Sequence, residues 1–466
     1  MGSSRRSRPS EAGARDLAAH VAGELTRCTA AGARIALGLS GGIDSVVLLD
    51  VLAAVQPRRG YALSAVHVNH GLSPNAEFWQ RFCERLCRRR GIALRTERVQ
   101  VARGDSTESA ARAARYRVFE RLDADAVVLA HNQDDQAETL LLQLLRGAGV
   151  KGLSAMPVVR PAAGRSRLER LSAIPPPAIV RPLLDVPRAE IEAYARARRL
   201  KWIEDESNDD VAYDRNYLRH RVLPALEQRF PGYRTTLARA ARHFAEAEQL
   251  LDALAAIDAR GAVAGGGLRV DRLQRVGATR AKNLLRRFLD AAGVPMLPAA
   301  RLEECVRQVL AAGTDSAVRI DAGAAALRLF DGVLSVVDGA AGPQPDYRVA
   351  WHGEPALELD ALGGTLYMCL ARGDGISAAK LAQGPVTVRV RRGGERIRPH
   401  RNRPRRTLKN LLQEKRLAPW RRERLPLLYV GDTLVWAAGI GVDCAYRAGA
   451  GEASVRPEWR QRASGA

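Results

Sequence analysis

Residues 33–146 carry the feature that most constrains the fold, because short apolar runs alternate there with amphipathic stretches. The apolar runs cover 35–39, 63–68, 92–99 and 126–130, and the stretches that follow them cover 46–55, 79–90, 108–122 and 135–147. The unit recurs at roughly 30 residues, which is typical of alternating strands and helices. The pattern predicts an α/β fold with a doubly wound parallel sheet. Ligands bind such sheets beyond the carboxyl ends of the strands, so the loops beginning at Ser40, Asn69 and His131 should converge.

Shifts in composition divide the chain into four parts. We expect a flexible basic N-terminus with a leading helix at 1–30, the α/β catalytic domain at 31–225, a helical domain at 226–345 and a small α+β domain at 346–466. The third part has Ala-, Leu- and Arg-rich helical periodicity, and the fourth alternates strands and glycine turns around one helical segment, LKNLLQEKR. Residues 157–182 are rich in Pro, Ala and Arg without periodicity, so we predict a surface loop there without chemistry.

The chain is strongly basic, and Arg greatly outnumbers Lys. Lys and Arg total 73 against 51 Asp and Glu, which gives a formal net charge of +22. Such an excess concentrates polyanions, and the planar guanidinium can fork onto a phosphate or stack on a base. A nucleic-acid partner is favoured over the alternative, an Arg-rich genome bias, because bias alone usually adds acidic residues to match.

Cysteine usage and hydropathy favour a cytoplasmic protein. The six cysteines form neither a disulfide framework nor a zinc spacing, and the closest pair is Cys83 and Cys87. No stretch approaches about 18 uninterrupted apolar residues, so we expect no membrane span. The first segment, MGSSRRSRPS, has no apolar run behind it, which argues against a secretory signal but leaves an organelle leader open. Whether the chain forms a homodimer is also open.

The segment SGGIDS at 40–45 is the strongest local signal for chemistry, because it lies between the first predicted strand and a helix expected to begin near Val46. Its glycines allow a sharp turn close to phosphate oxygens, its serines can donate, and the helix start offers free N–H groups. Asp44 would repel a bare phosphate, so its presence predicts a bridging Mg²⁺. The Walker lysine and the GxGxxG spacing are both absent, so neither an ordinary NTPase loop nor a dinucleotide-binding loop fits. The alternative is a purely structural glycine turn. The expected ATP-binding residues here are Ser40, Gly41, Gly42, Ile43, Asp44 and Ser45.

Three carboxylates follow the fourth predicted strand. Asp135 and Glu138 are three residues apart at a helix start and share one face, with Asp134 and His131 beside them. Acids are also favoured at helix N-termini for structural reasons, so Asp134 could be a simple cap and Glu138 a solvated neighbour. Their position at the carboxyl end of a strand favours a functional role.

The adjoining phosphate loop favours a functional role for two histidines, whereas two arginines on a predicted helix could have either role. His67 and His70 could be ordinary loop histidines, yet at the end of the second strand they should border an adenosine pocket. A shared metal is disfavoured, because HxxH at a strand end directs the rings to opposite faces. Arg112 and Arg115 lie in a predicted helix, where a solvated basic face is the alternative.

Several segments together resemble a known family. SGGIDS resembles the pyrophosphate loop of the N-type ATP pyrophosphatases, or PP-loop ATPases, and further blocks narrow the resemblance to the tRNA(Ile)-lysidine synthetases. These blocks are HVNHGL (67–72), ESAARAARY (108–116), HNQDDQAETLLLQLLRGAGVKGLSAM (131–156), WIEDESNDDVAYDRNYLRHRVLP (202–224), RRGGERIRP (391–399), LKNLLQE (408–414), PW (419–420) and RLPLLYVGD (424–432). Residues 226–345 match only in length and helical character. Asn132 stands where many relatives carry a second histidine.

The resemblance implies an ATP- and Mg²⁺-dependent ligase. Such an enzyme joins L-lysine to C2 of the wobble cytidine of isoleucine tRNA with a CAU anticodon, through an adenylated cytidine. The implied catalytic residues are Asp44, Asp135, Glu138 and Arg112; His67 and His131 join the ATP site; Asp44, Asp134 and Asp135 hold Mg²⁺; and Arg115, Arg215, Asn216 and Arg219 contact tRNA. Charge clustering adds Arg391, Arg392, Arg396, Arg398, Arg405 and Arg406 as expected phosphate contacts.

Three other functions compete with this hypothesis. A PP-loop tRNA thiolase would need a sulfur-carrying cysteine or an iron–sulfur cluster, but the sequence has no CxxC and no cysteine in the predicted ligand loops. A small-molecule PP-loop amidotransferase or synthetase would leave the basic C-terminal domain unexplained. A non-catalytic RNA-binding protein would require neither SGGIDS nor the DDQAE segment at 134–138.

Overall fold

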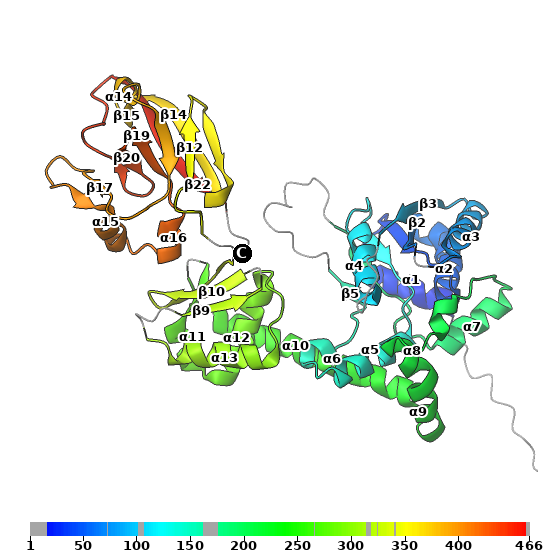
Figure 1. Ribbon diagram of the computed structural model, residues 1–466. Helices are drawn as coiled ribbons and strands as arrows, with labels where there is room; N and C mark the ends of the chain where they lie inside the picture. Colours follow the sequence, from blue (N-terminus) through cyan, green and yellow to red (C-terminus); the bar gives the residue numbers. More distant parts are fainter. Residues whose placement is uncertain are drawn as a thin grey trace, which may run out of the picture. The chain divides into compact units, whose positions relative to one another are not determined.

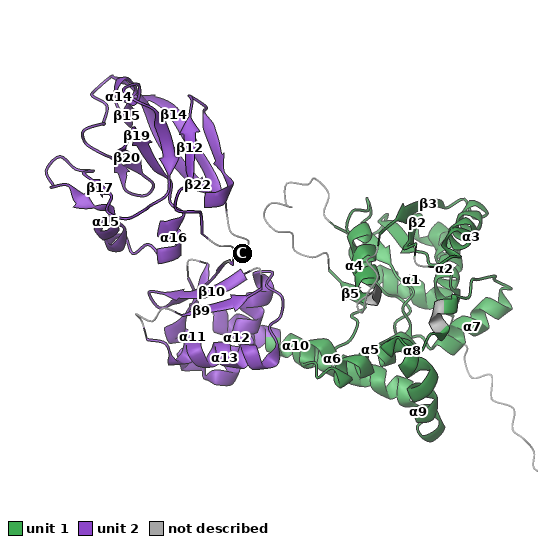
Figure 2. Cartoon of the chain, in the orientation of Figure 1, with its two compact units in different colours: residues 1–251 green, residues 252–466 purple. Residues whose placement is uncertain are grey.

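The computed structural model describes residues 16–71, 73–100, 107–161, 176–264, 266–313, 318–323, 325–339 and 342–462. The basic first residues and the middle of the 157–182 segment lie outside these ranges. Figure 1 follows the chain by colour, and Figure 2 separates its two compact units, Met1–Leu251 and Asp252–Ala466. Each unit is described by itself.

Unit 1 is built on a six-stranded sheet with the strand order β3-β2-β1-β4-β6-β5. The strands are β1 (Arg34–Gly38), β2 (Ala62–Asn69), β3 (Ala93–Arg98), β4 (Ala126–Val128), β5 (Val159–Arg160) and β6 (Ala178–Val180). All pairs are parallel except β5 with β6, so the predicted parallel sheet is confirmed. The strand order reverses between β1 and β4, and ligands of doubly wound sheets bind at such a switch point.

Helices cover both faces of this sheet. Ile35 and Leu37 of β1 lie in one buried cluster with side chains of α1 (Leu17–Cys28), α2 (Ile43–Arg59), α3 (Ala76–Arg88) and α7 (Arg188–Ala197). Ala36, between them, lies in a second cluster with side chains of α4 (Thr107–Phe119). A strand that is buried on both faces needs apolar side chains at successive positions, which explains the continuous apolar runs of the sequence.

The helix that follows β4 carries the predicted carboxylates. The remaining elements of unit 1 are α5 (Gln133–Leu145), α6 (Val150–Leu153), η2 (Glu206–Asp209), α8 (Asp214–Tyr217), the π-helical turn η3 (Leu218–Val222), α9 (Leu223–Arg229) and most of α10 (Tyr233–Ala259). A small cluster of Ala137, Leu223 and Tyr233 packs α5 against α9 and the start of α10. This packing brings the segment around α8 and η3 to the carboxylate end of α5.

The segment 157–182 differs from the prediction of a loop. Its ends form β5 and β6, which extend the sheet beyond β4. The prediction failed because strands of two and three residues are too short to show periodicity. Arg181, directly after β6, is only 2% exposed, so this part of the segment belongs to the interior.

The first part of unit 2 combines helices with a sheet. Its helices are α11 (Val270–Val276), α12 (Ala278–Ala291) and α13 (Ala299–Ala311), and its antiparallel strands are β7 (Val263–Ala264), β8 (Gly267–Arg269), β9 (Arg319–Ala322), β10 (Ala325–Phe330) and β11 (Val333–Asp338). Leu268, Leu285 and Leu327 represent one buried cluster that joins the helices to the sheet. The helical character of this part agrees with the prediction, but the five-stranded sheet was not predicted.

The C-terminal part of unit 2 contains two sheets, a hairpin and three short helices. Its strands are β12 (Arg348–Trp351), β13 (Ala356–Leu359), β14 (Gly364–Arg372), β15 (Ile376–Ser377), β16 (Val386–Arg389), β17 (Arg396–Ile397), β18 (Arg406–Thr407), β19 (Leu427–Val430), β20 (Thr433–Ala437), β21 (Gly441–Val442) and β22 (Ala453–Gln461). Its helices are α14 (Ala378–Leu381), α15 (Leu408–Glu414) and α16 (Pro419–Glu423). The predicted small α+β domain is confirmed, with α15 at the LKNLLQE segment.

Within the described ranges, no helix is both long enough and apolar enough to cross a bilayer.

Candidate active site

The SGGIDS segment joins β1 to α2 beside the switch point of the sheet. Helix α2 begins at Ile43, three residues before the expected start, with Gly42 as its N-cap. Asp44 and Ser45 therefore lie in the first helical turn rather than in a loop. The start of a helix offers N–H groups that have no intrahelical partner, together with the positive end of the helix dipole. This end of α2 is therefore suited to hold phosphate oxygens.

Glycine and serine side chains shape the turn that precedes α2. Gly41 has a φ of 93°, and a Cβ at this position would lie 2.8 Å from Cδ1 of Ile203, so a larger residue is excluded. The Ser45 hydroxyl donates to the Gly42 carbonyl at 2.9 Å and accepts from the Gly41 N–H at 3.1 Å. Ser40 Oγ lies 3.1 Å from Ser45 Oγ. These bonds preorganise the turn, which limits the conformational entropy lost when a ligand binds.

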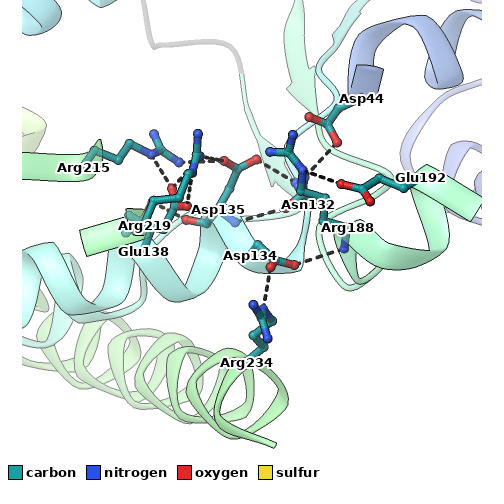
Figure 3. Close-up of polar contacts among 11 residues, drawn as sticks. Asp44, Asn132, Asp134, Asp135, Glu138, Arg188, Glu192, Arg215, Arg219 and Arg234 are labelled. Atoms are coloured by element: carbon teal, nitrogen blue, oxygen red, sulfur yellow. Dashed lines mark hydrogen bonds and ion pairs between the residues drawn. The ribbon is translucent and has the colours of Figure 1, made fainter. Parts of the chain in front are cut away.

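Asp44 extends from the first turn of α2 toward the start of α5 (Figure 3). Its Oδ1 accepts a hydrogen bond from Asn132 Nδ2 at 3.0 Å. Burial raises the pKa of the Asp44 carboxyl to about 6; Arg188 lowers it in part, while the nearby Asp135 raises it further. A half-buried carboxylate next to a second carboxylate is stabilised in its charged form by a bound cation. Asp44 is therefore well suited to a cation that bridges to phosphate.

Asn132 and Asp135 form a capping box at the N-terminus of α5. The Asp135 N–H donates to Asn132 Oδ1 at 3.1 Å, and the Asn132 N–H donates to Asp135 Oδ2 at 3.0 Å. Because the Asn132 amide also reaches Asp44, one side chain fixes both carboxylates. The structural alternative named Asp134 as the cap, but the N-cap is Asn132 and Asp135 completes the capping box. The other oxygen of Asp135, Oδ1, accepts from Arg215.

Glu138 lies one turn further along α5 and is surrounded by two arginines (Figure 3). Arg215 Nε donates to Glu138 at 2.7 Å, and Arg219 donates to it through Nε at 2.7 Å and Nη2 at 3.0 Å. The Glu138 side chain is 2% exposed, so it is not a solvated neighbour. Arg215 also reaches Asp135 at 2.8 Å. The two carboxylates and two guanidiniums form one charge-balanced cluster.

This cluster accounts for residues that were expected to contact tRNA. Arg215 and Arg219 come from α8 and η3, and their guanidiniums point to the carboxylates of α5. Asn216, between them, is 9% exposed and donates to the Asp210 carbonyl at 2.9 Å. The side chains of Arg215 and Arg219 are 20% and 27% exposed, so part of each is still open to solvent. A contact of these three residues with tRNA stays a prediction.

Asp134 points away from Asp44 and has a structural set of partners. It accepts from the backbone N–H of Arg188 at 3.0 Å and from the side chain of Arg234 on α10. Figure 3 shows these contacts on the far side of α5 from Asp135 and Glu138. Asp134, expected as a third Mg²⁺ ligand, is held away from Asp44 by these contacts, so we do not group it with Asp44 and Asp135.

Asp44 and Asp135 remain as the carboxylates that could share Mg²⁺. Within the described residues, no group of three or more His, Cys, Asp or Glu side chains is arranged to hold a metal. Mg²⁺ usually takes only one or two protein carboxylates and completes its shell with phosphate oxygens and water. A site that combines two carboxylates with a phosphate loop therefore fits this cation.

Three histidines lie near the carboxyl ends of β2 and β4; His67 is buried, whereas His70 and His131 are half-buried. His67 Nδ1 lies 2.9 Å from the Leu39 carbonyl, and burial lowers its pKa. Burial lowers the pKa of His70 to about 4, with a further contribution from Arg115. Burial and the charges of Arg181 and Arg115 lower the pKa of His131 well below its usual value. All three are neutral at pH 7, so their rings can donate or accept hydrogen bonds at the edge of the site but cannot bind phosphate as cations.

Arg112 and Arg115 lie on α4, on the His131 side of the site. Arg112 Nη2 donates to the Tyr116 hydroxyl at 3.4 Å, and its Cζ lies 5.2 Å from the centre of that ring. Arg115 acts on both His70 and His131 through its charge. These positions agree with a role beside the nucleotide rather than with a purely solvated face, although contact with a ligand stays a prediction.

The six C-terminal arginines gather on and around the β17–β18 hairpin. Arg392, Arg396, Arg398 and Arg405 are exposed, whereas Arg391 and Arg406 are half-buried. Arg406 pairs with Glu414 on α15, and Arg391 lies 3.7 Å from Glu395. The exposed members are the ones available to phosphate, so the expectation applies best to them.

Sequence reasoning missed several partners of the site. Arg188 and Arg234 hold Asp134 from elements far along the chain, and nothing in their local sequence marks them. Arg181 was assigned to a loop without chemistry, yet it donates to the Tyr116 hydroxyl at 3.1 Å. Asn132 was noted only as a departure from relatives, although its position directly before an acid-rich helix start is typical of an N-cap.

Three family models match the chain in succession. A PP-loop domain matches residues 16–226, a TilS substrate binding domain matches 268–335, and a TilS substrate C-terminal domain matches 386–459. The matches follow the order of the α/β, middle and C-terminal parts described above.

Curated relatives are similar over nearly the whole length. The chain is 44% identical to a tRNA(Ile)-lysidine synthase of Nitrosomonas europaea, over 92% of each chain, and 41% identical to one of Azoarcus sp., over 94% of each chain. Among solved structures, the U34-tRNA thiolase NcsA of Methanococcus maripaludis has 20% identity and a TM-score of 0.41, covering 50% of this chain and 79% of its own. That score is too low to inform function.

Proposed function

The chain belongs to the tRNA(Ile)-lysidine synthase family, and on that premise we propose that it joins L-lysine to C2 of the wobble cytidine in CAU-anticodon isoleucine tRNA. It is a ligase that modifies tRNA and uses ATP. In the proposed reaction the cytidine C2 oxygen attacks the α-phosphate of ATP and pyrophosphate leaves. The lysine ε-amino group then displaces AMP, which yields lysidine. We place this reaction in the cytoplasm.

The observation that carries the proposal is the link from Asp44 through Asn132 to Asp135. It joins a phosphate-binding helix start to a second element that bears carboxylates, at the switch point of the sheet. An adenylating enzyme needs this combination, because it must hold a triphosphate in line and neutralise the leaving pyrophosphate. A simple RNA-binding surface needs neither feature.

Asp44 and Asp135 are the residues that would hold Mg²⁺. When bound, the cation would offset charge on the pyrophosphate leaving group. The chain's own contribution is to keep both carboxylates oriented through the Asn132 amide and backbone, so that little reorganisation is needed when ATP arrives.

The acids on α5 would also bind the nucleophile, which is the ε-amino group of lysine. The lysine ammonium must lose a proton before it can attack, and a carboxylate near it can hold the cation and accept that proton. Asp135, with 17% of its side chain exposed, is better suited to this contact than Glu138, with 2%. Glu138 then acts through Arg215 and Arg219, whose guanidiniums it orients. Arg112 would stabilise charge on the adenylate.

The C-terminal arginines would hold the body of the tRNA. Arg396 and Arg398 are exposed on one hairpin region, and each can neutralise a phosphate. Arg405 is also exposed, but it pairs with Asp443 at 3.4 Å. Arg115, Arg215, Asn216 and Arg219 would contact the anticodon region, where an arginine plane can stack on a splayed base.

A thiolase remains the nearest competing function, and Cys83 is the residue to weigh. Its Sγ packs behind the phosphate loop, 3.3 Å from where a Cβ on Gly41 would lie. The thiol is fully buried, and burial raises its pKa to about 12. A sulfur carrier needs an accessible thiolate, so Cys83 argues against this function.

Exchange of labelled pyrophosphate into ATP tests the order of the two steps. We expect exchange in the presence of CAU-anticodon isoleucine tRNA without lysine, and none with Asp44→Ala. Exchange that needs lysine but not tRNA would mean that the amino acid is activated instead, and would refute the adenylated cytidine.

A further inference from the structure

Three arginines from separate elements gather on one tyrosine beside the site. Arg181 Nη2 donates to the Tyr116 hydroxyl at 3.1 Å, and Arg112 Nη2 approaches the same oxygen at 3.4 Å. The Cζ atom of Arg160, at the end of β5, lies 4.4 Å from the centre of the Tyr116 ring. The guanidiniums of α4, β5 and the end of β6 thus converge on a single aromatic side chain.

No carboxylate balances this group among the residues that the structure describes. Within the described ranges, the contacts of Arg112 and Arg160 are those with Tyr116, and Arg181 adds a hydrogen bond to the Pro157 carbonyl at 2.8 Å. By contrast, Arg215 and Arg219, in the same unit, share two carboxylates. The arginine group therefore differs from the structural ion pairs around it.

Arg181 makes the imbalance costly. Its side chain is 2% exposed, and its Nε has no hydrogen-bond partner in the described structure. Buried Arg side chains are normally paired, because desolvation of an unpaired cation and repulsion between like charges both oppose folding. Burial would raise the pKa of the Tyr116 hydroxyl, but the charges of Arg181, Arg112 and Arg160 outweigh it and lower that pKa. An anion at this point would offset the repulsion.

The position of the group is next to the reacting parts of the site. Arg181 and Arg112 are close enough to His131 to lower its pKa. His131 directly precedes Asn132, which bonds Asp44. An oxyanion held by these arginines would thus lie beside His131, at the carboxyl end of β4, next to the Asn132 side chain that bonds Asp44.

We propose that Arg112, Arg160 and Arg181 form an oxyanion site around Tyr116 that takes a carboxylate or phosphate group of a substrate. The site rests on the proposed function for its ligand, since that reaction brings both chemistries: the α-carboxylate of lysine and the phosphates of ATP and tRNA. Guanidinium forks match both groups, which present two oxygens in one plane. Arg160 and Arg181 become binding residues that no motif marks.

A first experiment uses inorganic phosphate and does not depend on the reaction. The melting temperatures of the wild type, Arg160→Gln, Arg160→Lys and Arg117→Gln are compared in chloride and in phosphate at equal ionic strength. Arg117 is the matched control, because it is exposed on α4 and has no recorded partner in the described structure. We expect Arg160→Gln to be at least as stable as the wild type in chloride, because a like charge is removed. Its stabilisation by phosphate should fall by about half or more, as expected when a ligand site is weakened.

The conservative variant Arg160→Lys and the control Arg117→Gln make this result specific. Arg160→Lys keeps a cation and should retain most of the phosphate response, and Arg117→Gln should retain all of it. A loss of stability in chloride for Arg160→Gln, with an unchanged phosphate response, would show that Arg160 only packs on Tyr116 and would overturn the site.

A second experiment identifies the source of the oxyanion. Rates are measured with lysine and with 1,5-diaminopentane, which is lysine without the carboxylate, and the tRNA concentration is varied at several salt concentrations. If the site binds the carboxylate, Arg160→Gln should narrow the preference for lysine about tenfold, as loss of a charged hydrogen bond does. If it binds a tRNA phosphate, the KM for tRNA should rise and the salt slope should fall by about 1. If it binds a phosphate of ATP, the KM for ATP, measured at saturating tRNA and lysine, should rise instead.

The outcomes separate the two claims. If neither the lysine preference, the KM for tRNA nor the KM for ATP changes in Arg160→Gln while wild type forms lysidine, the oxyanion site has no substrate and the inference fails alone. If the wild type forms no lysidine with any partner, the proposed function fails, and the phosphate response still reports on the site.

Discussion

Asn132 donates its side-chain amide to Asp44 across 3.0 Å, although 88 residues separate the two in sequence. The same side chain caps α5 and is bonded by the Asp135 N–H. The phosphate loop and the carboxylate helix therefore meet through one neutral amide. Because an amide adds no charge, it can orient both carboxylates without neutralising the negative charge that would bind a cation.

Replacing Asn132 separates its two roles. Asn132→Ser keeps an N-cap oxygen but cannot reach Asp44, so the melting temperature should change little while turnover falls about tenfold or more. Asn132→Ala also removes the cap, which costs about 1 kcal/mol and lowers the melting temperature by roughly 2–4 °C. Calorimetry and single-turnover rates measure the two effects. Equal turnover in the wild type and Asn132→Ser would remove Asn132 from the catalytic account.

The raised pKa of Asp44 predicts that neutralising this side chain raises stability but lowers turnover. Because its folded pKa of about 6 lies above its ordinary value, the folded state binds more protons between pH 4 and 6, and stability is lost as the pH rises through this window. Asp44→Asn removes that loss. In chelator, without ATP, the variant should be more stable than wild type at pH 8 by on the order of 2 kcal/mol.

The same variant supplies its own control. The difference in stability between Asp44→Asn and wild type should shrink as the pH falls toward 4, where both side chains are neutral. Turnover of Asp44→Asn at pH 8 should fall by roughly 100-fold, as loss of a charged transition-state partner commonly causes. A stability difference that does not depend on pH would contradict the raised pKa.

Neighbouring acids on α5 should respond differently to mutation. Asp134→Ala removes the acceptor for Arg188 N–H and Arg234, so stability should fall by about 1–3 kcal/mol while the Mg²⁺ dependence of the rate is unchanged. Asp135→Ala should instead lower turnover by roughly 100-fold. Titration of the rate with Mg²⁺ compares them. A large rise in the Mg²⁺ requirement of Asp134→Ala would restore it as a ligand.

Exposed arginines of the β17–β18 hairpin should carry the salt dependence of tRNA binding. Arg396→Ala and Arg398→Ala should each reduce the slope of log affinity against log salt by about 0.9, the value for one phosphate contact. Arg372→Ala, exposed on β14, is the control and should leave the slope unchanged. Filter binding at several salt concentrations measures this. Slopes that match the wild type in both hairpin variants would exclude these contacts.

The sheet and the phosphate loop could be predicted because their signals are local. Ile35 and Leu37 alternate with Ala36 in an apolar run buried on both faces, and SGGIDS follows directly. The start of α2 was placed three residues late, because the acid and serine of the loop resemble residues that precede a helix rather than its first turn.

The side-chain network could not be predicted, because it joins residues far apart in sequence. Arg219 and Glu138 are 81 residues apart, and Arg234 and Asp134 are 100 apart. No periodicity connects such pairs. Arg181 was missed for a related reason: two-residue and three-residue strands carry too little pattern to mark the chain around it as interior.

The central claim is tested most directly by ATP-dependent incorporation of labelled lysine into CAU-anticodon isoleucine tRNA, followed by mass spectrometry of the nucleosides. Initiator methionine tRNA, which shares the anticodon, is the control. The account predicts lysidine in the isoleucine tRNA alone, dependent on ATP and lost in Asp44→Ala. No incorporation of lysine, despite exchange of pyrophosphate into ATP, would contradict the ligase assignment while leaving the nucleotide chemistry of the loop intact.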